Sequence, residues 1–126
     1  MVAAVCLFWA ALAHAEVRLR GSDEKNYRWT LRNGPHSFAS YRLGLILLQS
    51  GRPAQALEVL RPAVKLFAEK PDFQNAYCMA LWHNGDQPKA WALMKDLAQR
   101  HPDHRQIQEN AAGMRTRLAG EPGRQP

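Results

Sequence analysis

The chain has 126 residues, enough for one small domain but too few for two domains with separate cores. Hydrophobic residues make up 46% and charged residues 22% of the sequence, which is typical of a folded globular protein and excludes a fibrous or wholly disordered one. The net charge of +6 favours acidic partners in a general way without identifying one. Two cysteines are too few for a disulfide framework.

The first fifteen residues have the pattern of a secretory signal peptide. They contain no Asp, Glu, Lys or Arg, and Val2 to Leu12 is an uninterrupted apolar run. This run is shorter than the 20 or so residues that a membrane-spanning helix needs, and Ala13-His14-Ala15 has the small-x-small form of a cleavage site. We therefore predict a signal peptide over residues 1–15, a mature chain that starts at Glu16 without a stable membrane span, and a periplasmic or secreted location. Because no basic residue precedes the run, an uncleaved apolar helix of a cytoplasmic protein is the alternative.

From Ser37 onward the pattern is helical and repeats every 34 residues. A glycine ends the first helix of each unit and a proline opens the second, and equivalent positions carry similar residues: Gly51 and Gly85, Ala56 and Ala90, Leu47 and Leu81, Leu60 and Met94. We expect two helical hairpins, over residues 37–70 and 71–104. A thinner apolar stripe predicts a capping helix over residues 105–119, and residues 120–126 a disordered tail. Residues 16–36 are expected to include a short helix that packs on the first hairpin.

A helical hairpin period of 34 residues resembles the tetratricopeptide repeat. The packing residues that carry the resemblance are Leu43, Gly44, Leu47, Gly51, Ala56, Leu60 and Ala63 in the first unit, and Leu81, Gly85, Ala90, Met94 and Pro102 in the second. The second unit departs from the family pattern at Tyr77 and Cys78, where leucine and glycine are usual. The resemblance implies an all-α fold, a right-handed superhelix of two hairpins plus the capping helix.

The first helix of each unit carries a second apolar stripe, and this is the candidate binding surface. A helix that is apolar on two sides must be covered on both. The resemblance implies that this stripe faces the concave groove, where proteins of the family hold a peptide or helix of a partner. The candidate groove residues are Phe38, Tyr41, Leu45, Leu48, Asn75, Met79 and Trp82. The alternative is that the segment from Tyr27 to Leu31 covers Phe38 and Tyr41.

Other chemistry is weakly indicated. We expect Cys78 to be a buried packing residue. No nucleophile, phosphate loop or zinc-protease motif is present, so we predict neither an enzyme nor a cofactor. Basic residues are scattered, which does not favour nucleic-acid binding. Asp103 is expected to cap the last helix, although His101 and His104 suggest a metal site.

The sequence thus predicts an exported adaptor that binds a protein or peptide partner. A cytoplasmic secretion-type chaperone with an uncleaved apolar N-terminal helix and a metal-handling accessory protein are the alternatives. The sequence leaves the partner's identity and the oligomeric state open.

Overall fold

The structure, a computed structural model, describes residues 21–120. All regular structure in this range is helical: residues 21–32, followed by α2 (Ser37–Gln49), α3 (Pro53–Leu66), α4 (Pro71–His83), α5 (Gln87–Arg100) and α6 (Arg105–Gly120). The all-α prediction is confirmed. The proposed signal peptide lies outside the described residues, as does the expected tail except Gly120, which ends α6.

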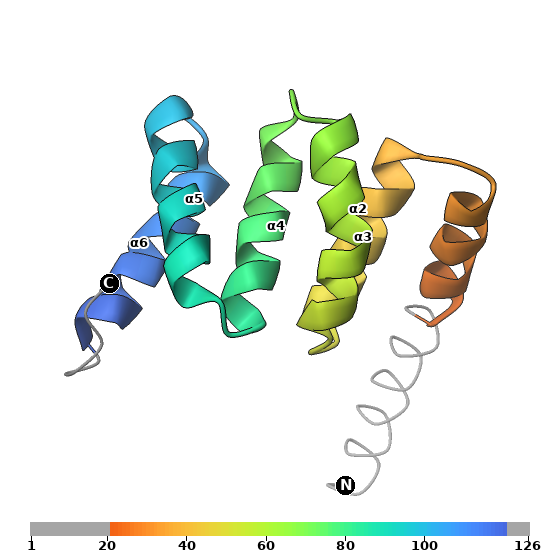
Figure 1. Ribbon diagram of the computed structural model, residues 1–126, viewed down its shortest axis with the longest axis horizontal. Helices are drawn as coiled ribbons and strands as arrows, with labels where there is room; N and C mark the ends of the chain where they lie inside the picture. The colour runs from red at the N-terminus through yellow and green to blue at the C-terminus, as the bar shows by residue number, and fades with distance from the viewer. Residues whose placement is uncertain (1–20, 121–126) are drawn as a thin grey trace, which may run out of the picture.

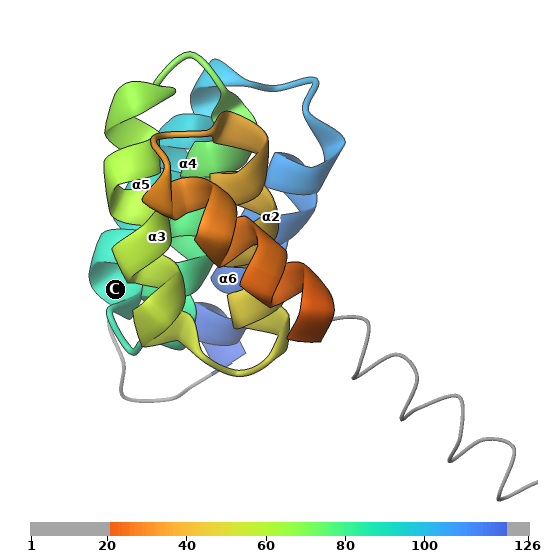
Figure 2. The same ribbon diagram turned by 90° about the vertical axis from the view of Figure 1, so that its right-hand side faces the viewer.

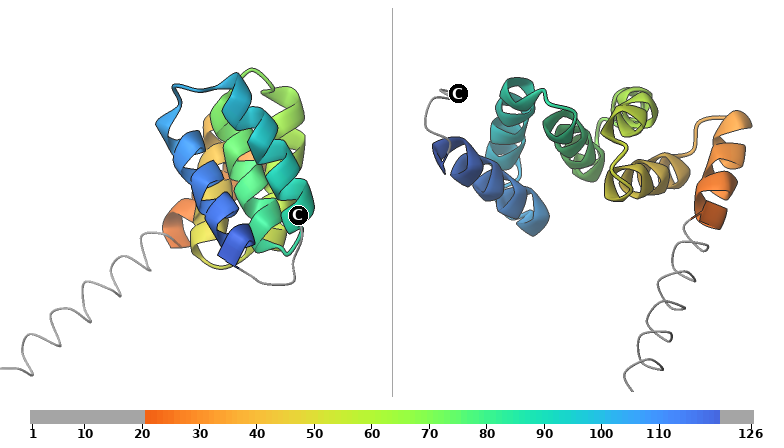
Figure 3. Two further views of the ribbon diagram at one scale, coloured as in Figure 1. Left: turned by 90° about the vertical axis from the view of Figure 1, so that its left-hand side faces the viewer. Right: turned by 90° about the horizontal axis from the view of Figure 1, so that it is seen from below.

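The helices form two antiparallel hairpins and a closing helix. Each helix from α2 to α6 contacts the next, and α2 also contacts α4. In Figure 1, residues 21–32 lie at one end of the array and α6 at the other. Seen from below in Figure 3, α3 and α5 line one side of the array, whereas α2, α4 and α6 face the opposite side. These three helices therefore form one continuous surface.

The hairpin turns repeat in their backbone geometry as well as in sequence. Gly51 has φ +71° and Gly85 has φ +93°, values that favour glycine. After α2, the Arg52 N–H donates to the Leu47 carbonyl at 2.9 Å, and after α4 the equivalent bond from Asp86 to Leu81 is 3.0 Å. This is the hydrogen-bond pattern of a Schellman cap. Pro53 and Pro88 then open the next helices, where their missing N–H costs nothing.

Small residues set the distance between the helices of each hairpin. A Cβ on Gly44 would lie 2.6 Å from Cδ2 of Leu60, so α2 and α3 approach as closely as glycine allows. One repeat later Cys78 is 2% exposed, as expected of a packing residue. Burial raises the pKa of the Cys78 thiol to about 12, so the reactive thiolate is disfavoured.

Residues 21–32, which we call the N-terminal helical segment, lie across the end of the stack (Figure 2). Tyr27 and Leu31 pack against the core. Glu24 forms an ion pair with Arg52 and another with Arg28. Arg52, which precedes α3, therefore ties the segment to the first hairpin.

Candidate partner-binding face

The seven candidate groove residues all lie on α2 and α4, but their exposure differs. Phe38 is 58% exposed, whereas Tyr41, Leu45, Leu48 and Met79 are half-buried. Asn75 and Trp82 are only 7% and 5% exposed. The expectation of an open apolar stripe therefore has to be corrected at these two positions, which form part of the protein interior. We use "groove face" for the surface made by α2, α4 and α6.

At the α2 end, the groove face is aromatic. The Tyr41 and Phe73 rings lie 5.5 Å apart, and a hollow of about 300 Å³ opens beside them between the starts of α2 and α4. Glu69, Lys70 and Asp72 supply charged groups around this hollow. Burial, and secondarily the charge of Asp72, raises the pKa of the Tyr41 phenol above its ordinary value.

The N-terminal helical segment covers only part of this end. The Tyr27 ring meets the Phe38 ring edge-on, with centroids 6.0 Å apart, yet Phe38 keeps more than half of its surface exposed. Tyr41 instead packs against Phe73 of α4. Intramolecular cover thus accounts for part of the Phe38 surface, while the half-buried Tyr41 and Leu45 are available in the groove face.

At the other end, α6 packs over α4 and accounts for the buried positions. Asn110 of α6 donates a hydrogen bond from Nδ2 to Oδ1 of Asn75 at 2.9 Å. Ile107, Ala111 and Met114 of α6 join the same core cluster as Trp82. Asn75 and Trp82 therefore link the capping helix to the second hairpin.

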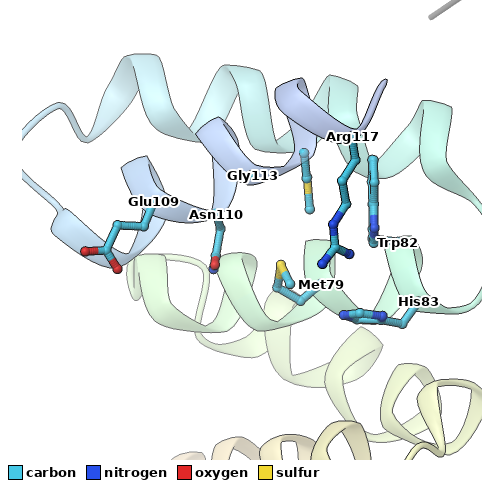
Figure 4. Close-up of a pocket in the computed structure, with 8 residues that line it drawn as sticks. Met79, Trp82, His83, Glu109, Asn110, Gly113 and Arg117 are labelled. Carbon is cyan, nitrogen blue, oxygen red and sulfur yellow. The ribbon is translucent and has the colours of Figure 1, made fainter. Parts of the chain in front are cut away.

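Between α4 and α6 the face opens into a second hollow, of about 150 Å³. Figure 4 shows Met79, Trp82 and His83 pointing into it from α4, while Arg117 reaches alongside Trp82 from α6. Gly113 of α6 borders the hollow, and a Cβ built there would meet nothing within 4 Å. The hollow combines an apolar floor with a rim that includes Glu109, Asn110 and Arg117.

The sequence analysis did not assign the α6 residues to the groove face. The 34-residue period contained a signal for them, because Glu109 and Gly113 follow Asn75 and Met79 by one repeat. Their polar and small side chains do not extend the apolar stripe, which is why the stripe alone missed them. The structure joins them to Met79 and Trp82 in one hollow.

The side chains of His36 and His104 cap the starts of two helices. His104 Nδ1 accepts from the Ile107 N–H at 3.4 Å and its Nε2 contacts Asp72 at 3.0 Å, so His104, and not Asp103 as expected, caps α6. His36 Nδ1 accepts from the Ala39 N–H at 3.3 Å at the start of α2. Within residues 21–120, no group of three or more His, Cys, Asp and Glu side chains is placed to hold a metal ion.

The last two observations concern membrane-spanning helices and the family to which the chain belongs. None of the helices in residues 21–120 has the length and apolar character needed to cross a membrane. A family model described as tetratricopeptide repeat matches residues 10–68 and 41–105, while neither a curated protein nor a solved structure matches the chain. Such repeats suggest a scaffold for protein–protein interactions and are generally not enzymatic. With the repeated hairpins in the fold, this match shows that the chain belongs to the tetratricopeptide-repeat family.

Proposed function

We propose that the protein is an exported adaptor that binds a peptide or helix of another protein on its groove face. The observation that carries the proposal is the open hollow between α4 and α6, where Met79 and Trp82 lie beside the charged and amide groups of Glu109, Asn110 and Arg117. An apolar floor with a few polar groups is the usual composition of a ligand site.

The groove face offers a partner two different kinds of contact. Phe38, Tyr41 and Leu45 at the α2 end would receive apolar side chains, since aromatic residues commonly anchor protein interfaces. Asn110 and Arg117 at the α6 end would receive backbone carbonyls or a carboxylate. A bound segment that is apolar at one end and acidic at the other would therefore match the face.

Export is supported by the sequence alone, through the charge-free run that ends at Ala13-His14-Ala15. Intact-mass measurement of the native protein tests it. We expect a chain that begins at Glu16 and is found outside the cytoplasm. A full-length chain in the cytosolic fraction would exclude export and favour the cytoplasmic chaperone alternative.

The binding surface is tested with site-specific photo-crosslinkers in cells of the source organism. A crosslinker at Met79 or Arg117 should capture one protein reproducibly, whereas the same group at the exposed Leu93 of α5 should not. Mass spectrometry of the crosslinked peptide then identifies both the partner and the segment it uses. If the crosslinker at Leu93 captures the same protein as strongly as the one at Met79 or Arg117, the partner is not specific to the groove face.

A pair of leucine substitutions on α6 separates blocking from unfolding. Gly113→Leu places a side chain in the α4–α6 hollow, where the glycine leaves open space, and we expect at least a tenfold loss of affinity for the captured partner. Ala112→Leu adds a similar bulk one residue earlier, on an exposed position outside the hollow, and should bind normally. Unchanged affinity for Gly113→Leu, with its helical spectrum intact, would exclude the hollow as the binding site.

A further inference from the structure

The outer side of the N-terminal helical segment carries a tryptophan between two basic residues. Trp29 is 66% exposed, the highest fraction among the exposed large hydrophobic residues of the described chain. Lys25 and Arg32 lie four residues before and three residues after it, so helical geometry places all three on one side. Both basic residues are exposed, and across residues 21–120 the structure gives their side chains no hydrogen bond or ion pair. We call these three residues the outer face.

The opposite side of the segment is fixed to the protein. Tyr27 packs on Phe38, and Leu31 packs against the core. Arg28 donates from Nη2 to Oε1 of Gln55 at 3.0 Å, and Glu24 is paired with Arg52. The segment cannot rotate to bury Trp29 without breaking these contacts. The outer face is therefore presented to the surroundings in a fixed orientation.

The composition of the outer face fits the surface of an anionic bilayer. An indole ring with flanking cations is the combination found where helices lie in the headgroup region, because the ring is amphipathic and the cations meet lipid phosphates. The acidic residues of the segment do not oppose this: Glu24 is neutralised by Arg52 and Arg28, and helical spacing places Asp23 away from Trp29.

The adjoining sequence adds to the same charge. Arg18 and Arg20 precede the segment, and residues 16–32 hold five basic residues against three acidic ones. A cluster of basic residues close to an apolar run is a common signature of attachment to anionic lipid. The position in the fold is also compatible, because the segment lies at the end of the array opposite α6 and its hollow (Figure 1).

We propose that Lys25, Trp29 and Arg32 dock the protein onto the surface of a bilayer that contains anionic phospholipid. Docking through this end leaves the α4–α6 hollow open, so the membrane and a protein partner bind at separate surfaces. The inference does not depend on the proposed groove function, since the two surfaces share no residue.

Vesicle co-sedimentation of the native protein tests this directly. Phosphatidylcholine vesicles with and without phosphatidylglycerol are compared, because the apolar N-terminal run, where present, contributes to both. We expect stronger binding to the vesicles that contain phosphatidylglycerol. The variant Lys25→Gln, Arg32→Gln should lower this binding about 25-fold, at about fivefold for each lost cation. Adding Trp29→Ala should lower it further.

A matched variant on α5 controls for net charge and for exposed apolar surface. Lys89→Gln, Lys95→Gln with Leu93→Ala removes the same number of cations and one large exposed apolar residue from a helix that lies away from the segment along the array (Figure 1), and should bind as the unmodified chain does. An equal loss in the control would reduce the effect to general electrostatics and overturn the proposal. Unchanged binding of the outer-face variant would also overturn it.

Two further measurements distinguish lipid from other anionic partners. Brominated phosphatidylglycerol should quench part of the tryptophan fluorescence, and that part should disappear in Trp29→Phe. Binding to duplex DNA or polyglutamate as tight as binding to anionic vesicles, and unaffected by Trp29→Phe, would show a polyanion site and exclude a membrane-docking one.

Discussion

The two hairpins share one register but differ where their helices meet. In the first, Gly44 of α2 has no side chain, and a Cβ would come within 2.8 Å of the Leu60 branch point. In the second, the equivalent residues are Cys78 and Met94, both buried, so a side chain occupies the position that is empty in the first hairpin. A branched leucine is thus paired with glycine, and a flexible methionine with a larger residue. Both pairs are closely packed, although neither residue is the same in the two hairpins.

The hairpins differ again on the groove face. Leu48 of α2 is half-buried, whereas Trp82, one repeat later, is 5% exposed. The Tyr41 ring packs at a tilt against the Phe73 ring, whereas the equivalent Asn75 is hydrogen-bonded to α6. The difference follows from the neighbours, since α4 is followed by a helix that packs over it. The same register position is therefore a surface site in one repeat and a core site in the next.

The largest loss of stability is expected at Trp82, compared with the equivalent Leu48. Trp82→Ala should destabilise the protein by about 3–5 kcal/mol, because a buried tryptophan is replaced by a cavity between α4 and α6. Leu48→Ala should cost about 1 kcal/mol, because its side chain is half-buried. Urea denaturation followed by circular dichroism measures both. Comparable losses at the two sites would show that α6 does not bury Trp82 in solution, and would restore it as an exposed anchor.

The next largest loss of stability is expected at the helix crossing, the point where Gly44 of α2 approaches Leu60 of α3. Gly44→Cys places the residue of the second hairpin in the first, and should cost about 1–3 kcal/mol through overpacking against Leu60. Adding Leu60→Met transfers the whole pair and should recover part of the loss, since methionine adapts its shape. The same denaturation experiment reports both values.

Gly113→Cys is the control for the crossing, because it makes the same substitution where nothing lies within 4 Å. It should change the free energy of unfolding by less than about 0.5 kcal/mol. A similar cost at Gly113 and Gly44 would mean that the loss arises from the helix backbone and not from the close approach of α2 and α3.

Most of the fold could be predicted from the sequence because the repeat is marked by turn glycines and by the spacing of packing residues. Gly51 and Gly85 marked the turns, and the spacing of Gly44, Leu47 and Leu60 marked the face of each hairpin. These features depend on periodicity and backbone preference within about 34 residues, which a single sequence displays. The same spacing placed Cys78 in the core, where the structure has it.

The candidate site was harder to predict because its burial depends on contacts between repeats. Nothing local to Trp82 or Asn75 indicates that α6 packs over them, and the Asn75–Asn110 bond joins residues 35 positions apart. The Glu24–Arg52 pair spans 28 positions. His36 and His104 were missed as caps because histidine is not among the usual N-cap residues. Side-chain identity gives little information on such pairings until the helices are placed.

A smaller loss of stability is expected at Cys78 of α4, which occupies the position of Gly44 in the second hairpin. In a Cys6→Ser background, Cys78 should react with a bulky thiol reagent only as fast as the protein unfolds, because the thiol is buried and its pKa is raised to about 12. Cys78→Ala should cost about 1 kcal/mol. Since the unfolded thiol titrates near pH 8.5, its contribution to stability should be present below that pH and be lost as the pH rises toward 12.

A cysteine introduced at position 113 of the same background, with Cys78→Ala, provides the comparison for labelling. Its thiol stands in open space and should react within the time that a free thiol requires. Rapid reaction of Cys78 itself, at a rate close to that of the introduced thiol, would contradict the buried crossing and reopen the possibility of a reactive cysteine.

The smallest loss of stability is expected at the attachment of the N-terminal helical segment to the first hairpin. Arg52 accounts for most of the lowering of the Glu24 pKa, so the ionised pair stabilises the attachment at neutral pH. Both side chains are partly exposed, and Glu24→Gln should therefore cost only about 0.5 kcal/mol. Because the folded pKa is lowered, this stabilisation is present above the unfolded value of about 4.3 and disappears as the pH falls through the folded value.

Amide hydrogen exchange in residues 21–32 should thus be faster in Glu24→Gln than in the unmodified chain at pH 7, once intrinsic exchange rates are divided out, and the difference should vanish in acid. Glu58→Gln on α3, an exposed carboxylate without a hydrogen bond in the structure, should leave exchange in the segment unchanged. The absence of any difference at pH 7 would assign the attachment to the packing of Tyr27 and Leu31 alone.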